Sequence, residues 1–147
     1  MPTDIEIARW RLRSQHLVTP HATDAAGVVS HLLAVQAENP SQSAWAVAAR
    51  TTTPDADDLN LLLASGAVIR THVLRPTWHY VAAEDAGLLI DVTAPRVRGT
   101  ADHVMREVFG LARDDAAAAA TVVLDVLGEG RPVDRPTLAA RLADAGR

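Results

Sequence analysis

Residues 67–82, AVIRTHVLRPTWHYVA, contain the β-type pattern that decides the predicted fold. Two β-branched, nearly alternating runs lie on either side of Arg75-Pro76. Two such runs with turn residues between them are typical of a β-hairpin. Because proline suits a two-residue primed turn badly, we expect a turn that is wider than the minimum.

The segments before and after this hairpin carry helix signals. Thr3 and Glu6 have the spacing of a capping box, so a helix is expected over residues 4–16. Asn39-Pro40 is a favoured helix start, and the helix that follows it should bury Trp45. Further helices are expected from Thr23, as the N-cap, to about residues 36–38, and over residues 55–65, 83–96, 114–127 and 137–143.

Helices followed by a two-stranded hairpin match the order of elements in a winged helix-turn-helix. The predicted fold class is therefore mainly α with a small β-hairpin wing. We expect residues 1–96 to form a first winged-helix domain, residues 97–113 a connector, and residues 114–147 the first helices of a second, incomplete winged-helix domain. On this interpretation, the chain is the N-terminal part of a longer protein.

Composition and charge limit the kinds of function that the chain can have. Of its 147 residues, 48% are hydrophobic but only 3% are aromatic, which favours close-packed helices. There is no cysteine, no apolar run that could span a membrane and no clustered histidine spacing, so we expect a cytoplasmic location, no membrane partner and neither a metal nor another cofactor. The net charge of −4 requires any nucleic-acid contact to come from a local arginine cluster.

Residues 33–41, LAVQAENPS, place Gln36 and Glu38 at the end of an apolar helical run. Positions i and i+2 of a helix point apart, but Pro40 disfavours a helical conformation at Asn39. The expected corner between two helices therefore allows both side chains to face one way. Spacing alone leaves two interpretations open: a two-residue site, or a solvated helix end in which Glu38 complements the dipole of the next helix.

Histidines and arginines supply further candidate residues. If the hairpin is tight, His72 and His79 should lie across from each other on one face, or they are ordinary strand residues beside inward-packed Trp78 and Tyr80. Exposed arginines need no partner, yet some are candidates for phosphate contacts: Arg9, Arg11, Arg13, Arg96 and Arg98.

Several of these motifs, in this order, resemble one family. They are residues 11–15 (RLRSQ), 31–40 (HLLAVQAENP) and 68–85 (VIRTHVLRPTWHYVAAED). The resemblance is to the winged-helix DNA-binding-domain family that includes the YcaQ/AlkZ-like DNA glycosylases, and it covers most of residues 9–96. It implies tandem winged-helix units and double-stranded DNA, alkylated in the case of a glycosylase, as the partner.

The resemblance also assigns roles to residues. The catalytic motif of the characterised glycosylases, Gln-x-Gln or Gln-x-Asp, falls on Gln36 and Glu38, so the second position departs from the motif. The wing motif Arg-Gly-Thr-x-His falls on residues 75–79, with proline in place of glycine. The residues implied in DNA binding are Arg11, Arg13, Arg70, Arg75, Thr77 and His79.

Base excision is chemically compatible with a glutamine and a carboxylate. The carboxylate can take a proton from water or stabilise an oxocarbenium-like state, and the amide can hold the water. Glu38 extends one methylene further than aspartate, and a shift of about 1 Å can cost roughly a hundredfold in rate. Three hypotheses follow: a glycosylase for alkylated bases, a non-catalytic winged-helix DNA-binding protein with a regulatory role, and a helical interaction module.

Overall fold

The computed structural model of the protein describes residues 1–19, 21–75, 77–128 and 130–146. The chain divides into two compact units, Met1–Val97 and Arg98–Arg147. Within the described residues the fold is mainly helical, with a small antiparallel sheet of three strands in the first unit. Pro76, on which the expectation of a wide turn depends, lies outside the described residues.

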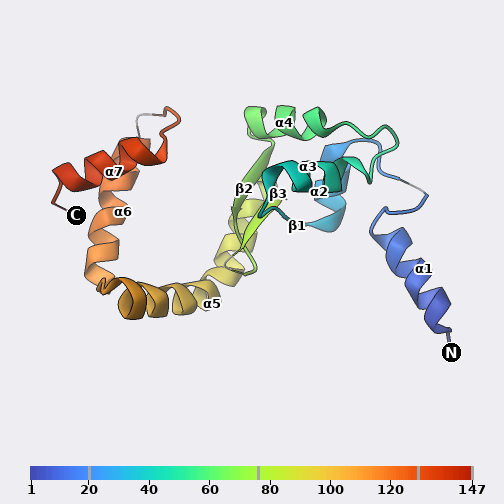
Figure 1. The fold of residues 1–147 in the computed structure, drawn as a ribbon, viewed down its shortest axis with the longest axis horizontal. Coiled ribbons are helices and arrows are strands. Elements are labelled where there is room, and N and C mark those ends of the chain that lie inside the picture. The colour runs from blue at the N-terminus through green and yellow to red at the C-terminus, as the bar shows by residue number, and fades with distance from the viewer. Residues whose placement is uncertain (20, 76, 129, 147) are drawn as a thin grey trace. The chain divides into compact units, whose positions relative to one another are not determined.

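The first unit places helices around this sheet. Its elements before the hairpin are α1 (Asp4–Ser14), α2 (Ala25–Leu32), β1 (Val35–Gln36), α3 (Pro40–Ala48) and α4 (Ala56–Ser65), as Figure 1 shows. The hairpin strands are β2 (Val68–His72) and β3 (Trp78–Ala82), and α5 (Ala83–Phe109) begins directly after β3.

The hairpin predicted from residues 67–82 is confirmed, and it gains a third strand. β2 and β3 pair in antiparallel register from Val68 opposite Ala82 to His72 opposite Trp78. On the other side of β3, the short strand β1 pairs Val35 with Tyr80 and Gln36 with His79, so the strand order is β1-β3-β2. The sheet therefore joins a segment from between two helices to the hairpin.

The expected boundaries of the second helix are wrong at both ends. Asp24, not Thr23, is the N-cap, because its carboxylate accepts a 2.8 Å hydrogen bond from the backbone N–H of Gly27. The helix ends at Leu32, and Leu33 leaves it with a φ of 65°. The backbone of Val35 and Gln36, which was expected to be helical, forms its hydrogen bonds with β3 instead.

β3 is covered on both faces, which makes it the centre of the first unit. Tyr80 belongs to one buried cluster with residues of α2, α3 and α4, among them Val29, Val47 and Leu59. Val81, the next residue, belongs to a second cluster with Leu89 of α5. Other members of these clusters are Ala25, Val28, Ala37, Ala44 and Val68 in the first, and Val73 and Ala86 in the second.

Trp45 was expected on the buried side of its helix, and this prediction is wrong. Its surface is 57% exposed, whereas Ala44 and Val47 of the same helix are buried. α3 packs on the sheet and on its neighbours through these small residues, which leaves the indole outside the core.

α5 extends beyond its expected end near Arg96 and continues to Phe109. Pro95 lies inside this helix and removes one backbone donor, so the carbonyl of Asp91 loses its usual helical partner. Both residues are exposed, and water can hydrogen-bond the freed carbonyl.

The second unit contains the end of α5 together with α6 (Arg113–Leu127) and α7 (Arg135–Asp144). Helices expected near residues 114–127 and 137–143 are thereby confirmed. α6 and α7 pack against each other, but none of the described residues from Arg98 onward is buried. This unit therefore has little core of its own.

Candidate functional site

Gln36 and Glu38 lie at a corner between a strand and a helix. The expected corner between two helices is corrected, since Gln36 ends β1 and α3 begins at Pro40. Asn39 is the N-cap of α3, as predicted, and its side chain accepts a 3.1 Å hydrogen bond from the backbone N–H of Gln42. Both candidate catalytic residues are exposed, and the buried residue between them, Ala37, anchors the corner in the core.

The carboxylate of Glu38 is fixed through one of its oxygens. Oε1 accepts a hydrogen bond of 2.8 Å from the backbone N–H of Trp78, the first residue of β3. Its other oxygen, Oε2, has no hydrogen-bond partner among the described residues. The carboxylate is thus oriented by the backbone and retains a free acceptor, which can take a proton or stabilise positive charge.

The side chain of Gln36 meets the same part of the hairpin. Its Oε1 accepts a hydrogen bond of 3.3 Å from Nη2 of Arg75. The amide nitrogen of Gln36 has no partner within the part of the chain that the structure describes, so it is available as a donor. The structure therefore brings the two residues of the Gln-x-Glu motif onto residues 75 and 78, about forty positions later in the sequence.

His79 is buried within the sheet, with only 4% of its surface exposed. It lies opposite Gln36 on one side and opposite Thr71 on the other, not opposite His72. The expectation that the two histidines face each other is therefore wrong. His72 lies opposite Trp78, with their ring centroids 3.9 Å apart.

Two further features accompany His79. Its Nδ1 lies 2.9 Å from the carbonyl oxygen of Thr77. Since a carbonyl only accepts, Nδ1 carries the proton and Nε2 is the free acceptor in the neutral ring. The hydroxyl oxygen of Thr77 is buried and has no hydrogen-bond partner among the described residues. The wing motif thus places polar groups inside the hairpin next to the corner.

Arg70 and Arg75, both candidates for DNA contact, differ in their surroundings. Arg75 is exposed, whereas Arg70 is half-buried and donates to the carbonyl oxygen of Ala37 through Nε at 3.0 Å and Nη2 at 2.9 Å.

Burial raises the pKa of Tyr80 above its ordinary value, and the positive charge of Arg70 offsets part of this rise.

Arg11 and Arg13 lie on α1, and no described contact joins either side chain to the corner. Both are exposed, and α1 has no buried residue. The end of α1 is held by His31, which donates to the carbonyl of Ser14 at 2.8 Å, and by Arg50, which donates to that of Gln15 at 3.0 Å. The two arginines therefore present charge on an exposed helix.

Trp78 is the site residue that sequence reasoning missed. It was expected only as an inward-packed residue of the hairpin, yet its backbone holds Glu38. Residues 38 and 78 come together only because β1 pairs with β3. A two-residue strand carries no periodicity by which it could be recognised.

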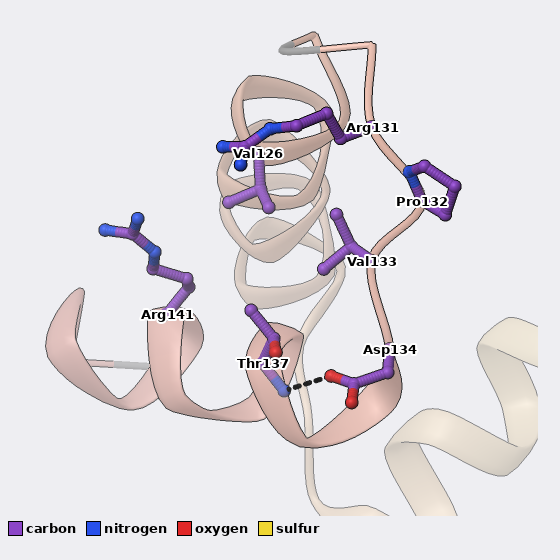
Figure 2. A pocket seen from close by; sticks show the side chains of 7 residues that line it. All are labelled: Val126, Arg131, Pro132, Val133, Asp134, Thr137 and Arg141. Carbon is purple, nitrogen blue, oxygen red and sulfur yellow. Dashed lines mark hydrogen bonds between the residues drawn. The ribbon is translucent and has the colours of Figure 1, made fainter.

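A groove of about 540 Å³ lies in the second unit, between α6 and α7 (Figure 2). Asp134 occupies the N-terminus of α7, where its carboxylate accepts a 2.9 Å hydrogen bond from the backbone N–H of Thr137. The remaining lining residues are Val126, Arg131, Pro132, Val133 and Arg141. None of the site residues predicted from the sequence lines this groove.

Two features are absent from the described residues. No group of three or more histidine, aspartate or glutamate side chains is placed to hold a metal ion. Within the same residues, no helix has the length and apolar character needed to cross a membrane.

The family model described as DNA glycosylase AlkZ-like matches residues 29–147, so the chain belongs to this family. The match includes the corner and the hairpin but begins after α1. A curated relative, the interstrand DNA cross-link repair glycosylase of Streptomyces sahachiroi, is 29% identical over 89 residues. These residues are 60% of this chain and 24% of that protein, so the chain spans about a quarter of the relative's length.

The fold is similar to that of a solved structure, the Streptomyces sahachiroi DNA glycosylase AlkZ. The TM-score is 0.71 at 24% sequence identity, and the similarity covers 90% of this chain and 35% of that one. This likeness supports the arrangement of helices and sheet described above.

Proposed function

We propose that the protein is a DNA-binding winged-helix glycosylase that excises alkylated bases, with Gln36 and Glu38 as its catalytic residues. The observation that carries the proposal is the geometry of Glu38, whose carboxylate is fixed through Oε1 and open at Oε2. Membership of the AlkZ-like family supports the reaction class. No metal or other cofactor is required for this chemistry, because water and a carboxylate suffice.

In the proposed reaction, Glu38 takes a proton from the attacking water or stabilises the oxocarbenium-like sugar. Gln36 holds the water through its amide, because its carbonyl oxygen is already bonded to Arg75. The hydrogen bond from Trp78 orients the Glu38 carboxylate, so the position of its free oxygen is fixed although the side chain is long. The cleaved bond joins the base to the sugar, and the products are free base and an abasic site.

The proposed DNA-binding architecture is a winged helix-turn-helix. In it, α2, α3 and α4 form the helical trio, and the hairpin β2–β3 forms the wing. We place this first winged-helix domain in residues 1–96, the connector in residues 97–113, and the first helices of a second domain in residues 114–147. Exposed Arg75 of the wing and Arg11 and Arg13 of α1 are the proposed phosphate contacts.

His79 and Thr77 are not proposed as phosphate contacts, unlike the arginines. His79 is buried in β3, where it lies opposite Gln36 of β1, so we expect any effect of His79 on DNA to be indirect. The hydroxyl oxygen of Thr77, in the same motif, is buried as well, so we do not propose it as a phosphate contact.

A non-catalytic DNA-binding protein is the alternative function. It is favoured by the hydrogen bond from Trp78 to Glu38, since that bond also gives the carboxylate a purely structural role. Glutamate at the second motif position is compatible with both functions.

Incubation of the purified protein with duplex DNA that carries a labile alkylpurine distinguishes the two. The glycosylase proposal predicts release of free base above the spontaneous rate. Duplex binding without any release, under conditions where a family glycosylase is active, would establish the alternative.

A further inference from the structure

Arg70 reaches from β2 across the central strand β3 to the corner beyond β1. Its Nε and Nη2 donate to the carbonyl oxygen of Ala37 at 3.0 and 2.9 Å, and Nη2 also donates to that of Glu38 at 3.4 Å. These carbonyls follow the last residue of β1, where the ladder to β3 has ended. The guanidinium of Arg70 therefore takes the place of a neighbouring strand as hydrogen-bond donor to the Ala37 and Glu38 carbonyls, where the Gln-x-Glu segment leaves the sheet.

The same guanidinium lies over the indole of Trp78, with its central carbon 4.4 Å from the ring centroid. Trp78 in turn donates its backbone N–H to the Glu38 carboxylate at 2.8 Å and accepts from the backbone N–H of Ala37 at 2.7 Å. Arg70, the corner and Trp78 thus form a closed ring of contacts. The backbone of Glu38, its carboxylate and the group that fixes this carboxylate are all held within it.

We propose that Arg70 is a positioning residue that fixes the Glu38 carboxylate, and that it does not act as a phosphate contact. The inference rests on the proposed function and revises the role that the family resemblance gave to Arg70. Two of its three nitrogens donate to peptide carbonyls, and one face of its plane is covered by Trp78.

Arginine has properties here that lysine lacks. A planar fork can donate two hydrogen bonds to one carbonyl oxygen while its face stacks on an indole. Lysine keeps the positive charge but donates as a point charge and cannot stack as a plane. The Arg70→Lys variant therefore separates a geometric role from an electrostatic one.

The experiment measures the backbone amide of Trp78 by NMR in the DNA-free protein. In Arg70→Lys and Arg70→Ala, we expect exchange of this amide to become faster by about tenfold, the order expected when a hydrogen bond to a charged group is weakened. Arg75→Lys is the matched control, because the Arg75 side chain donates to Gln36 and has no hydrogen bond to Trp78 or Glu38 among the described residues, so the Trp78 amide should be unchanged. Far-ultraviolet circular dichroism confirms that each variant retains its helices.

Two further readouts complete the test. Base release by Arg70→Lys should fall on the order of a hundredfold, as expected for a misplaced catalytic group. The salt dependence of duplex affinity should keep its slope, because no phosphate contact is lost.

An unchanged Trp78 amide in both folded Arg70 variants would overturn the inference, and so would a salt slope reduced by about one. If the wild type releases no base, the proposed function fails. The amide measurement still decides whether Arg70 holds the corner, because it needs neither DNA nor activity.

Discussion

The backbone N–H of Trp78 donates a hydrogen bond of 2.8 Å to Oε1 of Glu38, forty residues earlier in the chain. This bond joins the first residue of β3 to the segment between β1 and α3. It gives the Glu38 side chain a fixed position at the second place of the Gln-x-Glu sequence.

The core prediction concerns Leu59, which is 1% exposed and packs in the cluster between the sheet and the helices. Leu59→Ala should lower the free energy of unfolding by roughly 2–5 kcal/mol, because it leaves a cavity in that cluster. Leu61→Ala on the same helix is the matched control, since Leu61 is 71% exposed and its loss should cost less than about 0.5 kcal/mol. Denaturant unfolding measures both, and similar losses in the two variants would contradict the core.

The start of α2 gives a second prediction. Asp24→Ala should destabilise the protein by about 1 kcal/mol, because the N–H of Gly27 loses its acceptor. Thr23→Ala should have a much smaller effect, since the Thr23 side chain is exposed and makes no capping hydrogen bond. Thermal unfolding distinguishes them, and a larger loss in Thr23→Ala would show that the cap had been assigned to the wrong residue.

Tyr80 provides a pH prediction, because it is the only tyrosine of the chain. Burial raises its pKa above the ordinary value of 10.0, so the neutral phenol is favoured in the folded protein. Its contribution to stability is therefore complete below pH 10 and is lost as the pH rises through the folded pKa. Titration by tyrosinate absorbance should show a midpoint above 10, absent in Tyr80→Phe. A midpoint at or below 10 would refute the burial of this phenol.

DNA binding through α1 is tested by the salt dependence of duplex affinity. Replacement of Arg11 and Arg13 together by alanine should lower the slope of log K against log salt by roughly 2, about 0.9 for each lost phosphate contact. Arg106→Ala is the matched control, because Arg106 is an exposed arginine paired with Glu107. A slope that falls equally in the control would mean that general charge, and not α1, determines the binding.

The sequence predicted those parts of the fold that local patterns determine. The hairpin, the N-cap at Asn39 and the helix start at Thr3 follow from residues within a few positions of one another. The end of α2 did not, because it depends on pairing with a strand more than forty residues away. The exposure of Trp45 was not predictable either, because α3 is apolar on several sides and packs through Ala44 and Val47 instead.

The candidate site shows the same division between local and long-range information. The sequence alone marked Gln36 and Glu38 as polar residues at a corner, and the resemblance supplied the catalytic motif. The partners of these residues, Trp78, Arg70 and Arg75, became visible only with the strand register. The burial of His79 likewise follows from the position of β3 between two other strands and could not be predicted from a two-stranded hairpin.

Substitutions at residue 38 test whether the Glu38 carboxylate is catalytic. Glu38→Ala removes both the free oxygen and the acceptor for the Trp78 amide. Glu38→Gln retains an acceptor for that amide but removes the carboxylate. Glu84→Gln, at an exposed position of α5, controls for the loss of one negative charge.

The decisive measurement is the rate of free-base release from alkylated duplex DNA by these proteins. We predict that Glu38→Ala falls to the spontaneous rate, that Glu38→Gln is also strongly reduced because it lacks the carboxylate, and that Glu84→Gln matches the wild type. Release by folded Glu38→Ala at the wild-type rate would contradict the assignment, because the corner would then not be the site of base excision.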